Sequence, residues 1–442
     1  MKISKNFEAE IVDLGINGNG VTKKDGIVCF VPYTITGEKV LVNINKIEKN
    51  FCICTAEKII FPSKNRVLPN CPYFGKCGGC QLQHISKQTQ LEYKTKQIKT
   101  ILEKNLHQNI DVLPCISENN YHYRNKINFS IFQNRLCFSD NDNNFFAVSN
   151  CPLFVCDLTQ IINIFNNYLE KNKPNLKALH IRILNNVYQF TFVSNNINIP
   201  KFDELIDNLK NININFSLNF CINKIKNSSN IMGDIKCVYG DEKLDYENFG
   251  VKSKISPESF LQVNEEVQNK IYENINNKIS NSNNVINAYG GTGILSSIIS
   301  KKAKIVYSIE INKQASKNCQ EMINKNKLHN IFAICGDCKI EIPKLLETQN
   351  ISHIIFDPPR SGIDNSILEC VKKLNIENII YLSCNPSTLA RDLKILSDKY
   401  EVINVQPYDM FPQTHHIETL VFLKLKNILK SLYWHKTIIV IY

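Results

Sequence analysis

The sequence lacks the long apolar segments that secreted and membrane-spanning proteins carry. The first ten residues, MKISKNFEAE, contain no apolar core of a secretory signal. No segment reaches the roughly 18–20 uninterrupted apolar residues that a membrane span needs. We therefore predict a cytoplasmic protein with no membrane partner.

Compositions typical of fibrous and disordered chains are absent as well. Hydrophobic residues make up 43% of the 442 residues and charged residues 21%. These values exclude collagen-like, mucin-like and wholly disordered chains. The length predicts two or three domains, and no internal repeat is present. The net charge of +11 is compatible with a polyanionic partner but does not identify one.

Residues 1–60 are predicted to form a small β-barrel. Short strands recur about every ten residues, for example over 9–14, 26–32 and 37–42, with glycines in the turns between them. The lysines of this segment should lie on its surface: Lys39, Lys46, Lys49 and Lys58. Such barrels often bind nucleic acid, and an inert β-module is the alternative.

Two further regions follow the barrel. Residues 61–255 are predicted to form an α+β domain whose basic amphipathic helix, over 86–106, is a candidate to pack on the domain that follows. In residues 256–442, short apolar strands alternate with helical stretches, which predicts an α/β domain with a mainly parallel sheet. An irregular tail is predicted over 427–442.

Three cysteines lie close together in a glycine-rich segment. Cys71, Cys77 and Cys80 are spaced six and three positions apart, and Cys151 is the candidate for a fourth ligand. Because disulfides are rare in the cytosol, a thiol set of this kind suits an iron–sulfur cluster or a zinc site. Only one C-x2-C pair is present, and this favours iron–sulfur over zinc.

A glycine-rich loop follows a predicted strand in the α/β region. Asn287-Ala288-Tyr289-Gly290-Gly291-Thr292-Gly293 leads from that strand into a helix, and Glu310 ends the next strand about 20 residues later. Glycines allow the backbone to approach a ligand, and the carboxylate can accept hydrogen bonds from ribose hydroxyls. This arrangement favours an adenosine-containing cofactor.

Three more candidates lie next to predicted strands. Asp357 begins an Asp-Pro-Pro-Arg turn after one strand, Cys384 follows another in Ser-Cys-Asn-Pro, and Glu418 precedes the final strand. Ligands of parallel α/β folds bind at the carboxyl ends of the strands. An exposed thiol there can be a nucleophile and a carboxylate a base.

Taken together, these segments resemble the RNA uracil-5-methyltransferases over nearly the whole chain. The similarity is to the branch with a TRAM domain, an OB-like RNA-binding barrel, and an iron–sulfur cluster that modifies 23S ribosomal RNA. Tyr123-Arg124-Asn125-Lys126 and Ser259-Phe260-Leu261-Gln262-Val263-Asn264 are further signatures of this family. The resemblance implies a Rossmann-like S-adenosylmethionine-dependent methyltransferase domain, a TRAM barrel and a central α+β domain with the cluster.

The resemblance also implies a role for each candidate residue. Cys71, Cys77, Cys80 and Cys151 would hold a [4Fe–4S] cluster, and Gln262, Tyr289, Glu310 and Asp357 would contact S-adenosylmethionine. Cys384 would add to C6 of uracil, and Glu418 would remove the C5 hydrogen to allow elimination. The implied product is 5-methyluridine in 23S rRNA, made by a monomer. Two positions depart from the family pattern, since Asn287 replaces an aspartate and Gly290 a cysteine.

Three alternatives are kept. The substrate could be tRNA rather than rRNA. An amino-methyltransferase would use an Asn/Asp-Pro-Pro-aromatic motif, but Arg360 follows the prolines here. A non-catalytic RNA-binding protein with a zinc knot would not need Cys384 and Glu418.

Overall fold

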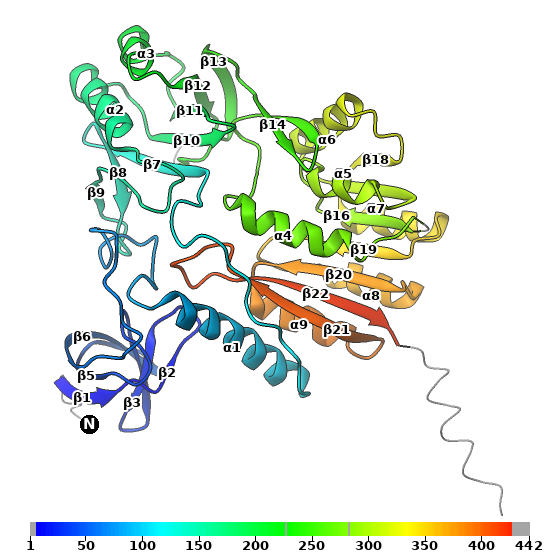
Figure 1. Cartoon of the computed structure of the whole chain (residues 1–442), viewed down its shortest axis with the longest axis horizontal. Helices are drawn as coiled ribbons and strands as arrows, with labels where there is room; N and C mark the ends of the chain where they lie inside the picture. Colours follow the sequence, from blue (N-terminus) through cyan, green and yellow to red (C-terminus); the bar gives the residue numbers. More distant parts are fainter. Residues whose placement is uncertain (1–5, 226–227, 282, 427–442) are drawn as a thin grey trace, which may run out of the picture.

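A computed structural model describes residues 6–225, 228–281 and 283–426, so the tail predicted over 427–442 lies outside the described residues. Most strands belong to three sheets of six, seven and seven strands, which follow one another along the chain (Figure 1). We call them the N-terminal, central and C-terminal sheets. Within the described ranges, no helix is long and apolar enough to cross a membrane.

The N-terminal sheet closes on itself. Its strand order is β1-β5-β6-β4-β3-β2, and the chain over 6–14 pairs with β5 through β1 and with β3 through β2. The predicted short strands are therefore present, and the four predicted surface lysines are exposed. The identity of this sheet as a TRAM module stays a prediction. Its strands are β1 Asn6–Glu10, β2 Asp13–Leu14, β3 Gly20–Lys24, β4 Ile27–Val31, β5 Lys39–Ile47 and β6 Phe51–Phe61.

The central sheet has the order β13-β12-β11-β10-β7-β8-β9. Apolar side chains on one face pack against α2 and form a core with Phe165, Phe190 and Phe192. The elements are β7 Lys126–Phe132, β8 Arg135–Ser139, β9 Phe145–Ala147, α2 Thr159–Asn172, β10 Ala178–Leu184, β11 Val187–Ser194, α3 Asp203–Lys210, β12 Asn215–Asn223 and β13 Gly233–Tyr239.

The C-terminal sheet has the order β18-β17-β16-β19-β20-β22-β21, and its first five strands are parallel. The mainly parallel sheet is as predicted, whereas the edge strand β21 was not predicted. The elements are α4 Glu265–Asn276, β16 Asn284–Ala288, α5 Ile294–Ser300, β17 Ile305–Glu310, α6 Lys313–Lys325, β18 Ile331–Cys335, α7 Cys338–Thr348, β19 His353–Phe356, α8 Asn365–Leu374, β20 Asn378–Ser383, α9 Pro386–Leu396, β21 Tyr400–Tyr408 and β22 Glu418–Leu425.

Two elements outside the C-terminal sheet pack on it or on its helices. Helix α1 (Lys87–Leu106) lies beside α9 and β21 (Figure 1), and its Ile98 and Leu102 join the core beneath the sheet. The hairpin of β14 (Leu244–Asn248) and β15 (Val251–Ile255) packs against α5 and α6. The packing of α1 agrees with the expectation for helix 86–106, and the domain boundaries stay predictions.

Candidate active site

Five of the predicted site residues meet at one edge of the C-terminal sheet. Tyr289, Asp357 and Cys384 directly follow the parallel strands β16, β19 and β20, and Glu310 ends β17. Glu418 begins β22, which runs antiparallel, so it lies at the same edge. The strand order reverses between β16 and β19, and this is where ligands of open α/β sheets bind.

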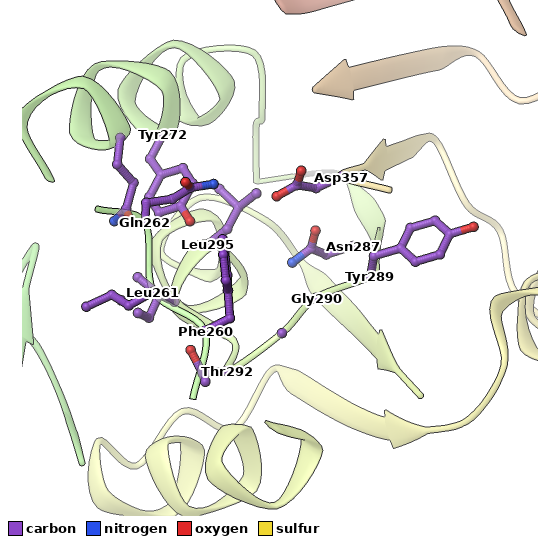
Figure 2. Close-up of a pocket in the computed structure, with 13 residues that line it drawn as sticks. Phe260, Leu261, Gln262, Tyr272, Asn287, Tyr289, Gly290, Thr292, Leu295 and Asp357 are labelled. Carbon is purple, nitrogen blue, oxygen red and sulfur yellow. The ribbon is translucent and has the colours of Figure 1, made fainter. Parts of the chain in front are cut away.

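A small pocket of about 70 Å³ opens at this edge (Figure 2). Its walls include three of the four predicted cofactor-binding residues: Gln262, Tyr289 and Asp357. In Figure 2 the ring of Tyr289 points away from Gln262. The walls come from the loop before α4, from α4 itself, from the glycine-rich loop, from the start of α5 and from the turn after β19.

The fourth predicted cofactor-binding residue, Glu310, is hydrogen-bonded to the glycine-rich loop. Its Oε2 accepts a hydrogen bond from the backbone N–H of Gly291 at 2.9 Å, and its Oε1 accepts one from Asn312 at 2.7 Å. Tyr289, Gly291 and Gly293 all have φ between +56° and +83°. A tyrosine in this region is strained, and such strain is concentrated at functional sites.

The two departures from the family pattern are linked by a buried hydroxyl network. Asn287 Nδ2 donates to Ser296 Oγ at 2.8 Å, and Ser296 Oγ donates to Ser308 Oγ at 2.9 Å. A Cβ added at Gly290 would lie 2.4 Å from Ser308 Oγ. The space that a larger residue would need at position 290 is therefore taken by the serine that completes the network.

We expect Gly290→Ala to destabilise the protein by roughly 1–3 kcal/mol, because the new Cβ forces Ser308 or the loop to move. In a Ser308→Ala background the clashing oxygen is gone, so the same substitution should cost measurably less. A double-mutant cycle by denaturant unfolding measures this coupling. Equal costs in both backgrounds would contradict the assigned contact.

The loop before α4 is held from three directions. Arg182 of β10 donates to the carbonyl oxygens of Ser256 and Ser259 at 3.0 and 2.5 Å. Asn125 Nδ2 donates to the Gln262 carbonyl at 3.1 Å, and Asn318 Nδ2 donates to Ser259 Oγ at 2.9 Å. The central sheet therefore fixes one wall of the pocket.

Phe260 is a residue of this loop to which the sequence analysis gave no role. It lines the pocket, yet 74% of it is exposed. An aromatic ring at the edge of a polar pocket can stack against an unstacked nucleobase. Its place in the Ser259–Asn264 family signature was the signal for it in the sequence.

Cys384 and Glu418 are neighbours across two antiparallel strands. The register pairs Ser383 with Thr419, so the next residue of one strand faces the preceding residue of the other. Glu418 is only 5% exposed, and burial raises its pKa well above the ordinary value, with a further contribution from Asp357. Burial and the Glu418 and Asp357 carboxylates raise the pKa of Cys384 to about 11.

Burial also raises the pKa of Asp357 to about 7. The folded protein therefore holds a proton on Asp357 that the unfolded chain releases near pH 4. The stability from this proton is complete below about pH 4 and is lost as the pH rises through about 7. The ligand-free site thus favours neutral carboxyl groups, and a cation bound there would return them to the charged form.

We expect Asp357→Asn to lack this pH-dependent loss of stability. The melting temperature of the ligand-free variant, relative to wild type, should rise between pH 5 and pH 8, since only the wild type must then bury a charged carboxylate. Thermal unfolding at several pH values measures this difference. A difference that is constant with pH would show that Asp357 titrates normally.

The four predicted metal ligands share one cavity but form no metal-binding group. Cys71, Cys77, Cys80 and Cys151 all line a cavity of about 530 Å³ beside the central sheet. Burial raises the pKa of Cys80 to about 12 and also raises that of Cys77 and Cys151. Across the ranges described above, no three His, Cys, Asp or Glu side chains are close enough together to hold a metal ion. The predicted [4Fe–4S] centre therefore stays a prediction.

Comparisons with known proteins give two family matches in the C-terminal part of the chain and relatives that match nearly all of it. Residues 339–426 match the family described as tRNA (Uracil-5-)-methyltransferase, and residues 252–356 match ribosomal RNA adenine dimethylase. A protein of Clostridium tetani (strain Massachusetts / E88), named as an uncharacterized RNA methyltransferase, is 33% identical over 455 residues, covering 96% of this chain and 97% of the relative. The chain belongs to the RNA methyltransferase family.

A second relative supports this assignment, and a solved structure has the same fold. A relative with the same description from Caldanaerobacter subterraneus subsp. tengcongensis is 32% identical, covering 96% of this chain and 99% of the relative. The solved structure of a Pyrococcus abyssi tRNA (uracil-54, C5)-methyltransferase, in complex with S-adenosyl-L-homocysteine, has a TM-score of 0.77 at 22% identity. That match covers 94% of this chain and 100% of the archaeal chain. It confirms the mixed α/β methyltransferase fold.

Proposed function

We propose that this RNA methyltransferase transfers a methyl group from S-adenosylmethionine to C5 of uracil in RNA. The observation that carries the proposal is the adjacency of Cys384 and Glu418 at the sheet edge that also carries the Asp357 pocket. A thiol and a buried carboxyl group side by side supply a nucleophile and a base. The match of residues 339–426 to the uracil-5-methyltransferase family supports the same chemistry.

The thiol of Cys384 activates the base. Its sulfur forms a bond to C6 of uracil while the thiol proton leaves to water, and electron density moves to C5. When bound, S-adenosylmethionine supplies an electrophilic methyl group and a positive sulfonium charge. A positive charge near Asp357 lowers the pKa of Cys384 and so offsets the rise caused by burial.

Glu418 completes the reaction. After methyl transfer, C5 carries both the new methyl group and its original hydrogen. The Glu418 carboxylate removes this hydrogen as a proton, the C5–C6 double bond forms again, and the bond between C6 and the Cys384 sulfur breaks. Because its pKa is raised, Glu418 is a stronger base than an exposed glutamate.

Gln262, Tyr289, Glu310 and Asp357 are proposed to hold the methyl donor. Three of them line the pocket, and Glu310 lies against the glycine-rich loop. Phe260 is available to stack on the target uracil, which must leave its helical stack to reach Cys384.

We propose 23S rRNA as the substrate and the N-terminal sheet as a TRAM-type RNA grip. Exposed Lys49 and Lys58 suit contacts with phosphates. The alternative substrate is tRNA, and the description of the matching family and the archaeal neighbour favour it. Mapping 5-methyluridine in rRNA and tRNA of a deletion strain distinguishes the two. Loss from tRNA alone would overturn the rRNA assignment.

We propose that the cavity of the four cysteines holds a [4Fe–4S] cluster with a structural role. The donor set fits, since four thiols line one cavity and the backbone N–H of Gly79 points to Cys77 Sγ at 3.4 Å. The protein purified without oxygen should therefore absorb near 400 nm, and Cys80→Ser should lose this band. A colourless protein that contains zinc would support the zinc alternative instead.

A further inference from the structure

The loop between β21 and β22, residues 409–417, directly precedes Glu418 and is unusually buried. Asp409, Met410, Gln413 and Ile417 are each no more than 2% exposed. A buried loop is rare, because its backbone polar groups lose water and need partners in the protein. The partners of this loop come from segments hundreds of residues away.

Gln90 of α1 forms two hydrogen bonds with Gln413 of this loop. Its Nε2 donates to Gln413 Oε1 at 3.0 Å, and its Oε1 accepts a hydrogen bond from the backbone N–H of Gln413 at 3.3 Å. Both side chains are buried, and Gln413 has a φ of +72°. A non-glycine residue in that region persists only where its surroundings hold it.

The other contacts connect the loop to the cysteine segment, by which we mean residues 71–82 with Cys71, Cys77 and Cys80. The carbonyl oxygen of Gln413 accepts hydrogen bonds from the backbone N–H groups of Gln81 and Leu82 at 3.1 and 3.0 Å. These two residues directly follow Cys80. Gln90 Nε2 also lies 3.0 Å from the carbonyl oxygen of Leu82, so one side chain connects both segments.

A buried ion pair fixes the start of the loop. Lys94 of α1 lies one helical turn after Gln90, and its Nζ is 2.5 Å from Asp409 Oδ1, with both side chains almost fully buried. The same Nζ donates to the carbonyl oxygen of Phe411 at 3.4 Å. Helix α1 therefore contacts the loop at Asp409, Phe411 and Gln413.

We propose that Gln90 and Gln413 are positioning residues for the Glu418 base. Through their hydrogen bonds, the conformation of the cysteine segment helps to fix the position of Glu418. This inference rests on the proposed function, because it assigns Glu418 the removal of the C5 proton. Neither glutamine lines the Asp357 pocket, which is the proposed site of the methyl donor. Their loss should therefore slow proton removal and product release more than methyl donor binding or methyl transfer.

The test compares Gln90→Ala with Gln88→Ala in single-turnover reactions. Gln88 is an exposed glutamine on the same helix, paired with Glu92, and serves as the matched control. The RNA is the one in which wild-type protein forms 5-methyluridine. A displaced base should slow release roughly 10- to 100-fold, so a denaturation-resistant protein–RNA adduct accumulates with Gln90→Ala but not with Gln88→Ala.

A second variant keeps the test decisive if Gln90→Ala does not fold. Gln413→Gly suits the positive φ, so it removes the side chain without backbone strain, and it should also accumulate the adduct. Methyl transfer and release that slow by the same factor, or a variant identical to wild type, would overturn the positioning role. Absence of 5-methyluridine with the wild type would instead overturn the proposed function.

Discussion

Protein carrying Cys384→Ala should bind S-adenosylmethionine with wild-type affinity and yet methylate RNA on the order of 10⁴-fold more slowly or not at all. The thiol lies at the end of β20 and does not line the pocket with Gln262 and Asp357. Without the sulfur, C5 of uracil stays too weak a nucleophile to attack a sulfonium. The measurement is methyl incorporation into RNA, alongside equilibrium binding of the methyl donor.

Cys370→Ala is the matched control for this substitution. Cys370 is a partly buried thiol of α8, away from the strand ends that form the site. Its variant should keep wild-type activity. Turnover by Cys384→Ala near the wild-type rate would mean that the reaction does not use a covalent adduct at this residue.

With Glu418→Gln, we expect methyl transfer to proceed and release to fail. The amide cannot accept the C5 proton, so the methylated adduct cannot eliminate, and turnover should fall by roughly 10²–10⁴-fold. A covalent protein–RNA species that survives denaturation should then accumulate and carry the label from the methyl donor. The measurement is a denaturing gel that detects both RNA and the transferred methyl group.

The adduct also tests whether it forms on Cys384 and whether Glu418 acts after methyl transfer. It should require Cys384, so the double variant with Cys384→Ala should show none. An unlabelled adduct would place Glu418 before methyl transfer rather than after it. Normal turnover with no adduct would assign proton removal to another group.

Much of the site follows from local sequence patterns. Asp357 and Cys384 each follow a short apolar strand, and parallel strands bring their carboxyl ends to one edge. Glu418 lies at the same edge only because β22 runs antiparallel to β20. No local sequence pattern predicts the direction of a strand in its sheet. The edge strand β21 was not predicted; its pairing with β22 is irregular between Val402 and Asn404, and it contains Pro407, which weakens a strand prediction.

The contacts that hold the site are much less predictable. Lys94 lies in a helix with several exposed lysines, yet it is fully buried against Asp409, 315 residues later. Gln90 and Gln413 are likewise paired across 323 residues. Helical periodicity marks Ile98 and Leu102 as core residues, but a polar residue on a buried face has no such signature.

For the cysteine motif, the sequence indicated which residues lie together but not how far apart their sulfur atoms are. Its spacing identified Cys71, Cys77 and Cys80, and Cys151, the candidate fourth ligand 71 positions after Cys80, lines the same cavity. Spacing alone, however, does not place sulfur atoms at the distances that a metal ion requires, and the thiols form no metal-binding group within the described part of the chain.

The most direct test of the account uses RNA whose uridines carry tritium at C5. Methylation through an adduct at C6 must expel that hydrogen, so wild-type protein with S-adenosylmethionine should release one tritium into water for each methyl group incorporated. Methyl incorporation into this RNA without tritium release would place the methyl group on another atom and contradict uracil C5 as the target.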